Sequence, residues 1–124
     1  MVKGIHHISM KCERMDEFET MKDFYQNLIG LPVKREWDGG IMFDAGNALI
    51  EVFSSGGNKG KGAIDHLAFQ TDNVDAIIEK VKQAGYEVFI EPTDIVIPSE
   101  PAYPARMAFC RGPLGEEIEF FQER

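Results

Sequence analysis

The alternation of apolar and polar positions predicts two strands that repeat one another. Residues 5–12 and 64–71 each begin with isoleucine, a polar residue and a histidine, and then alternate apolar with small or polar side chains. Such alternation over four to eight residues is typical of a half-buried strand. The histidines His7 and His66 occupy matching places in the two stretches. The chain is therefore predicted to contain an internal repeat.

A second pair of stretches supports the same repeat. Residues 50–53 and 118–121 are β-rich and apolar except for one glutamate each, Glu51 and Glu119. A lone glutamate among apolar neighbours in a strand either faces solvent by alternation or is held inside by a cation. We keep both interpretations open for each residue taken alone.

Each half also carries one helical pattern. Between residues 16 and 29 apolar side chains recur on one helical face, with Asp16 as the expected N-cap and a glycine directly after the end. In the second half the pattern covers residues 74–84, with Asn73 as the expected N-cap. Two amphipathic helices, each covering one part of a sheet, are predicted.

The remaining segments complete two βαβββ units. Further strands are predicted at residues 31–38, 41–44, 48–53, 86–90, 106–110 and 117–122. Residues 91–104 contain four prolines and cannot form a paired central strand throughout. This segment is expected either to form a wall or lid over a site or to be an irregular connector.

The expected fold class is α+β, with two tandem βαβββ units forming one curved mixed sheet that carries its helices on the outer face. Residues 1–124 are expected to form a single domain, because one unit alone could hardly bury its sheet face. The first unit is assigned to 1–54 and the second to 63–124. Residues 55–62 are rich in glycine and have linker composition.

The first predicted strand contains two adjacent histidines, and alternation along the strand places their side chains on opposite faces. Period 2 places His7 and Ser9 on one face of the strand and His6 on the other. Only one histidine of the pair can then belong to a site, and the repeat favours His7.

Composition limits the classes of partner. The 124-residue chain has a net charge of −8, which argues against nucleic acids and anionic membrane surfaces. No apolar run approaches the roughly 18 residues that a membrane span requires. No secretory signal is evident, and the two cysteines have no framework spacing, so we expect a cytoplasmic protein with reduced thiols.

The repeat brings candidate metal ligands together. Equivalent strands of two related halves would gather His7, Glu51, His66 and Glu119 around a pseudo-twofold axis. Nitrogen and oxygen donors of this kind suit a borderline divalent ion such as Zn²⁺, Ni²⁺, Co²⁺, Fe²⁺ or Mn²⁺. A single histidine would more often be an ordinary core or surface residue, and the hypothesis therefore depends on the repeat.

Three features resemble the vicinal oxygen chelate superfamily across nearly the whole chain. They are the paired histidine strands, the run from Asp23-Phe24-Tyr25 to Leu28-Ile29-Gly30-Leu31, and the closing segment Gly112–Glu119. Within that superfamily, the His/Glu/His/Glu order resembles glyoxalase I, also called lactoylglutathione lyase.

The resemblance implies a function and roles for these residues. His7, Glu51, His66 and Glu119 would bind one divalent metal, Ni²⁺ or Zn²⁺ by preference. Glu119 would also carry the proton and Glu51 would assist, as the hemithioacetal of methylglyoxal and glutathione is converted through an enediolate to S-lactoylglutathione. A homodimer is expected, and the two units could pair within one chain or across two.

The sequence departs from the family pattern at several positions, which leaves the substrate less well specified than the family. Lys11 stands where an arginine is frequent, Gly112 replaces a usual aspartate, and Ser54-Ser55 follows where an asparagine is common in glutathione-using members. Lys11 and Arg106 are candidates for binding a substrate carboxylate, with exposed salt bridges as the alternative for each.

Two alternatives remain open. One is another enzyme of the superfamily, such as a methylmalonyl-CoA-epimerase-like enzyme, although members resembling that epimerase usually carry an amide in place of Glu51. The other is a metal-free small-molecule binding protein of the drug-resistance type, which lacks the ligand set. The thiol and the carbonyl compound are not determined by these residues.

Overall fold

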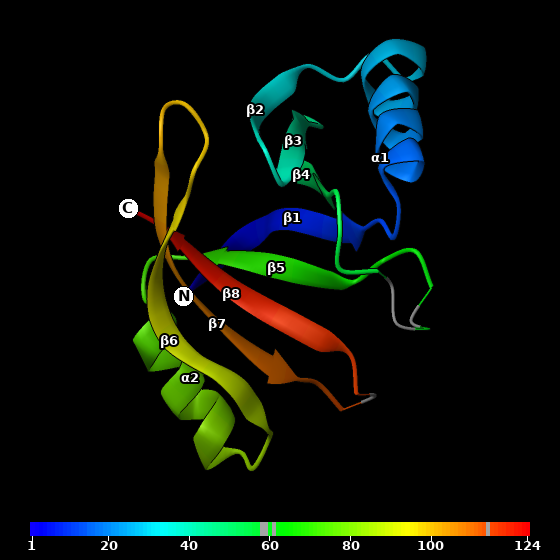
Figure 1. The fold of residues 1–124 in the computed structure, drawn as a ribbon. Coiled ribbons are helices and arrows are strands. Elements are labelled where there is room, and N and C mark those ends of the chain that lie inside the picture. The colour runs from blue at the N-terminus through cyan, green and yellow to red at the C-terminus, as the bar shows by residue number, and fades with distance from the viewer. Residues whose placement is uncertain (58–59, 61, 114) are drawn as a thin grey trace.

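A computed structural model describes residues 1–57, 60, 62–113 and 115–124. Eight strands form one sheet in the order β2-β3-β4-β1-β5-β8-β7-β6, and it curls around an open concave side (Figure 1). The first half contains β1 (Val2–Lys11), α1 (Met15–Lys22), the π-helical segment η1 (Asp23–Leu28), β2 (Val33–Trp37), β3 (Gly40–Asp44) and β4 (Leu49–Phe53). The second half contains β5 (His66–Thr71), α2 (Val74–Gln83), β6 (Val88–Ile97), β7 (Tyr103–Arg111) and β8 (Glu117–Glu123).

The strand pairing relates the two halves. β1 pairs with β5 in antiparallel fashion at the middle of the sheet, β1 is parallel to β4, and β5 is parallel to β8. The predicted α+β fold of two tandem βαβββ units with a curved mixed sheet is therefore confirmed. In this structure the two units pair within one chain. Among the described residues no helix is both long and apolar enough to span a membrane.

Helix α1 differs from its prediction at both ends. It begins at Met15, and the Glu17 carboxylate accepts the backbone N–H groups of Glu13 (2.8 Å) and Arg14 (3.1 Å), so the prediction of Asp16 as N-cap is wrong. After Lys22 the backbone widens into η1 instead of continuing as α-helix. The helix packs one buried residue, Phe18, against the apolar side chains of β1, β3 and β4.

Helix α2 follows its prediction closely. The Asn73 side chain accepts the backbone N–H of Ala76 at 3.0 Å, which satisfies one of the free amides of the first turn. Val74 and Ile78 are buried against apolar residues of β7 and β8, including Ala108 and Phe120. Helix α2 therefore packs on the convex face of the second half of the sheet.

The proline-rich segment is largely a strand. The strand predicted at 86–90 extends to Ile97 as β6, because β6 is the edge strand and Pro92 lies within a register irregularity between Ile90 and Thr93. Two of the other prolines lie in the connection to β7. The interpretation of 91–104 as an irregular connector is thus corrected. Part of the predicted linker 55–62, namely residues 58, 59 and 61, lies outside the described residues.

Truncation of Ile78 tests the packing of α2. We expect Ile78→Ala to lower the free energy of unfolding by about 2–5 kcal/mol, because the side chain is 2% exposed and leaves a cavity when it is shortened. Urea unfolding followed by circular dichroism measures the loss. Lys80→Ala, on the exposed side of α2, is the control and should change stability little. A loss for Ile78→Ala no larger than that of the control would contradict this packing.

Candidate functional site

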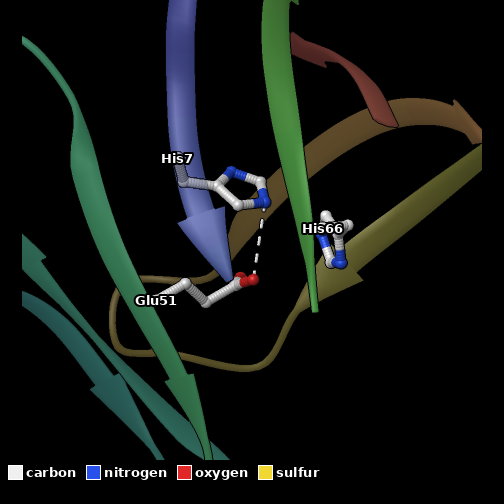
Figure 2. Close-up of side chains that lie close together, drawn as sticks. All are labelled: His7, Glu51 and His66. Atoms are coloured by element: carbon white, nitrogen blue, oxygen red, sulfur yellow. Dashed lines mark ion pairs between the residues drawn. The ribbon is translucent and has the colours of Figure 1, made fainter. Parts of the chain in front are cut away.

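Four ionisable side chains meet on the concave face, two from each half. His7 Nε2 lies 2.9 Å from Glu119 Oε1 and 3.4 Å from Glu51 Oε1, and His66 Nε2 lies 3.1 Å from the same Glu119 oxygen. Figure 2 shows His7, Glu51 and His66 pointing toward one another from β1, β4 and β5. All four are buried, with exposed fractions of 1% for His7, 3% for Glu51, 6% for His66 and 5% for Glu119. The structure thus brings together the four residues that the repeat predicts.

Sheet pairing explains this convergence. Glu51 is placed beside β1 by the parallel β1–β4 register, and Glu119 is placed beside β5 by the parallel β5–β8 register. The antiparallel β1–β5 pair then joins His7 to His66 across the pseudo-twofold axis. Each half contributes one imidazole and one carboxylate to the same point.

Burial and mutual contact shift the titration of these groups in different directions. Burial raises the pKa of Glu51 above its usual range, against the opposing effect of His7. Burial also raises the pKa of Glu119, but hydrogen bonds from His66 and His7 outweigh that effect and the pKa is lowered. Burial lowers the pKa of His66, but hydrogen bonds to Glu119 and Asp65 outweigh it and the pKa is raised. The two carboxylates are therefore not equivalent.

The cluster has the donor set of a divalent-ion site. Ligand atoms of His7, Glu51 and His66 all lie within 4.8 Å of one another, so they could hold one ion. With neutral imidazoles, a divalent cation balances the charge of two buried carboxylates, which are costly to bury without a partner. Ser9 lies opposite Glu51 in the strand register, and a hydrogen bond from its buried hydroxyl opposes the rise in the pKa of Glu51.

Asp65 supports His66 from behind. Its Oδ2 atom lies 2.7 Å from His66 Nδ1 and 3.4 Å from Lys11 Nζ. A carboxylate at Nδ1 fixes the imidazole so that Nε2 faces the cluster. The sequence reasoning missed Asp65, although it stands directly before a predicted ligand.

The prediction that His6 faces away from the site is wrong. Ile5 pairs with Phe69 and His7 pairs with Ala68, the next residue of β5, so His6 has no partner in the ladder. His6 is therefore the extra residue of a β-bulge. The bulge interrupts the alternation and turns both imidazoles inward, with their Nδ1 atoms 2.7 Å apart. The His6 ring packs against Phe121, with ring centroids 4.2 Å apart.

A cavity of about 450 Å³ opens over the cluster. Its lining combines Glu51, His66 and Glu119 with a largely aromatic and aliphatic wall. The wall and floor include Trp37, Phe53, Ile95, Val96, Ile97, Pro98, Phe109 and Phe121. Part of the proline-rich segment therefore forms a wall of this cavity, as one of its two interpretations proposed.

The two predicted carboxylate-binding residues have different positions. Lys11 lines the cavity and also pairs with Asp65. The structure does not bring Arg106 to the cavity. Alternation along β7 places Arg106 on the side of Ala108, which packs under α2, and its guanidinium binds Asp75 through two hydrogen bonds of 2.8 and 2.9 Å. This arrangement corresponds to the salt-bridging alternative for Arg106.

Comparison with known proteins places this geometry in a family. The model of the Glyoxalase/Bleomycin resistance protein/Dioxygenase superfamily matches residues 4–120. No curated protein sequence matches the chain.

Solved structures share the fold at low sequence identity. A methylmalonyl-CoA epimerase variant from Streptomyces coelicolor, in complex with 2-nitronate-propionyl-CoA, is 20% identical with a TM-score of 0.73, covering 98% of this chain and 95% of its own. The methylmalonyl-CoA epimerase of Mycobacterium tuberculosis is 17% identical with a TM-score of 0.72, over 99% of this chain and 89% of its own.

A Mn(II)-bound glyoxalase from Novosphingobium aromaticivorans is 22% identical with a TM-score of 0.72. The match covers 98% of this chain and 39% of that one. At these identities the likeness concerns the fold. The family match over residues 4–120, on a sheet of two βαβββ units, shows that the chain belongs to the Glyoxalase/Bleomycin resistance protein/Dioxygenase superfamily, the vicinal oxygen chelate superfamily that the sequence resembles.

Proposed function

We propose that this chain is a divalent-metal-dependent lyase or isomerase of the glyoxalase I type. Its substrate would be the hemithioacetal of a 2-oxoaldehyde and a thiol, of the methylglyoxal–glutathione kind, and its product a 2-hydroxyacyl thioester. One observation carries the proposal: two imidazoles and two carboxylates are buried together beside one cavity, and three of them line it.

His7, Glu51, His66 and Glu119 would hold the ion. Ni²⁺ or Zn²⁺ is the preferred ion, and Co²⁺, Mn²⁺ and Fe²⁺ also suit these donors. When bound, the ion supplies Lewis acidity that stabilises negative charge developing on a substrate oxygen. The burial of two carboxylates beside two imidazoles supports this assignment.

Glu119 is the proposed proton carrier. Its carboxylate lies between the two imidazoles, lines the cavity and has a lowered pKa, so it is ionised and can accept a proton from a substrate carbon. The proton taken from the thiol-bearing carbon returns to the neighbouring carbon. The hydroxyl proton of the thiol-bearing carbon passes to the oxygen of the former ketone, so the ketone becomes an alcohol and the thiol-bearing carbon becomes the thioester carbonyl. Glu51 faces the cluster from the opposite half and would assist the transfer.

The cavity walls would protect this transfer. Apolar side chains such as Phe109, Phe121 and Ile97 surround the carboxylates and limit the access of water to the reacting carbons. Lys11 would bind an anionic group of the substrate, in competition with its salt bridge to Asp65.

An epimerase-like enzyme is the second candidate. The methylmalonyl-CoA epimerases share this fold, and moving a proton beside a thioester carbonyl needs the same kind of base. The acid at Glu51, where such enzymes usually carry an amide, favours the glyoxalase reaction. A metal-free binding protein is the third reading, and the four buried ionisable groups argue against it.

Replacement of His7 tests the metal site. We expect His7→Ala to bind Zn²⁺ at least about 100-fold more weakly than the parent chain, because a direct ligand should cost more than a supporting residue. Competition with a chromophoric chelator measures the affinity, and elemental analysis measures the bound metal. Glu91→Gln, in an exposed ion pair with Lys82, is the control. Unchanged metal binding by His7→Ala would refute the four-ligand site.

Replacement of Glu119 tests the reaction. With metal restored to equal content, Glu119→Gln should lower kcat about 10²- to 10⁴-fold, because the amide cannot accept the proton. Thioester formation from methylglyoxal and glutathione is the assay for the Ni²⁺- and Zn²⁺-loaded parent. If the metal-loaded parent acts only on hemithioacetals of other thiols, the proposed thiol must be replaced. If it acts only on methylmalonyl thioesters, the epimerase is the better assignment. Full activity of Glu119→Gln would rule out its role as proton carrier.

The oligomeric state is a separate prediction. We expect a cytoplasmic homodimer, and exposed apolar side chains at the end of η1, Leu28 (73% exposed) and Ile29 (52% exposed), offer surface for a second copy. Light scattering coupled to size-exclusion chromatography should give twice the mass of 14.0 kDa. A monomer at micromolar concentration would contradict the prediction.

A further inference from the structure

A chain of hydrogen bonds connects a partly exposed carboxylate to His7. Tyr103 donates its hydroxyl hydrogen to Glu123 Oε1. His6 Nε2 lies 2.8 Å from the Tyr103 hydroxyl oxygen and 3.2 Å from Glu123 Oε1. On the other side of the same ring, His6 Nδ1 lies 2.7 Å from His7 Nδ1. The proposed metal ligand His7 is therefore linked through two buried rings to Glu123.

The chemistry of the groups fixes the direction of each hydrogen bond. An ionised carboxylate only accepts hydrogen bonds. The hydrogen bonds from Tyr103 and His6 lower the pKa of Glu123, which keeps it ionised. Since Tyr103 uses its hydrogen on Glu123, both groups in reach of His6 Nε2 are acceptors. His6 Nε2 must then carry a hydrogen.

The position of the hydrogen on His6 determines the position of the hydrogen on His7. A neutral imidazole has one N–H group, so a hydrogen on His6 Nε2 leaves Nδ1 as an acceptor. The short contact between the two Nδ1 atoms then requires His7 Nδ1 to donate. His7 Nε2 also lies 2.9 Å from Glu119 Oε1, a contact that holds a hydrogen in the metal-free chain. When an ion displaces that hydrogen, His7 keeps its hydrogen on Nδ1 and Nε2 offers its lone pair, which is the state that can bind a metal ion.

Neighbouring rings hold this chain in place. The Arg35 guanidinium carbon lies 3.5 Å from the centroid of the Tyr103 ring, and His6 packs on Phe121. His6 is 5% exposed and Tyr103 is 9% exposed, so water does not readily replace either partner. The β-bulge at His6 is what makes the contact with His7 possible.

We propose that Glu123, acting through Tyr103 and His6, is a positioning residue that fixes the tautomer and ring orientation of His7 for metal binding. This inference rests on the metal site of the proposed function and assigns three supporting residues to it. It gives the two imidazoles corresponding arrangements: Asp65 supports His66 directly, and Glu123 supports His7 through two intervening side chains. Carboxylates behind metal-binding imidazoles orient the ring and raise its basicity.

Glu123→Gln is the decisive variant. The amide can donate a hydrogen to Tyr103 or His6, so the direction of the chain is no longer imposed. We expect Zn²⁺ affinity to fall about 10- to 100-fold, the range found when supporting residues of metal sites are changed. Glu91→Gln makes the same chemical change at an exposed position and should leave the affinity unchanged. Thermal melts verify that both variants remain folded.

Three further variants separate positioning from packing. Tyr103→Phe keeps the ring and the His6–Glu123 contact, so it should lose less affinity than Glu123→Gln. His6→Asn retains an oxygen able to accept from His7 Nδ1, whereas His6→Ala does not. We therefore expect His6→Asn to recover part of the affinity that His6→Ala loses, which a purely steric role would not produce.

Nitrogen-15 NMR of the Zn²⁺-loaded parent, labelled at histidine, reads the tautomers directly. His6 should carry its hydrogen on Nε2 and His7 on Nδ1. Parent-like Zn²⁺ affinity in Glu123→Gln, or a hydrogen on His6 Nδ1, would overturn the inference. If affinity depends on Glu123 but no thioester forms from any hemithioacetal, the inference stands and the proposed function falls. A parent that binds no Zn²⁺ would overturn both.

Discussion

The burial of two imidazoles and two carboxylates at one point is the constraint on which the rest of the site depends. Charged groups removed from water are stable only when they are paired, hydrogen-bonded or bound to a cation. His7 and His66 both contact Glu119, and neither carboxylate is more than 5% exposed. A divalent ion would bind the imidazole nitrogens and carboxylate oxygens and would balance the charge that these contacts leave unpaired.

The pairing of the strands brings the four side chains of this cluster together. Each βαβββ unit places its first and last strands side by side in parallel, which puts one imidazole near one carboxylate. The antiparallel β1–β5 pair then brings the two sets together, and α1 and α2 cover the convex face. The concave face is left free for the cavity, whose apolar wall includes the edge strand β6.

Repetition made much of this predictable from the sequence, and local irregularity limited the rest. Matching strands in two halves predicted the fold and the meeting of His7, Glu51, His66 and Glu119. Alternation failed at His6 because a β-bulge adds one residue, and nothing in the pattern of side chains marks that residue. Asn73 was predictable as a cap because its own side chain accepts the first-turn amide.

The errors at other positions have similar physical causes. At α1 the N-cap residue is Arg14, and the capping carboxylate belongs to Glu17, three residues later in the helix. A cap of this kind does not place an aspartate, serine or asparagine at the first position, so Asp16 was predicted as the N-cap instead. The positive charge of Arg106 suggested a substrate ligand. Arg106 lies on the face of β7 that is covered by α2, however, and there its guanidinium binds Asp75. Residues that support a site from behind, such as Asp65 and Tyr103, become visible only when the strands are assembled.

Anomalous X-ray diffraction from crystals of the Zn²⁺-loaded chain, recorded on both sides of the zinc absorption edge, tests the central claim most directly. The account predicts one zinc peak per chain, within about 2.0–2.2 Å of His7 Nε2, His66 Nε2 and an oxygen of each of Glu51 and Glu119. No peak at the cluster, or a peak coordinated by other residues, would contradict it.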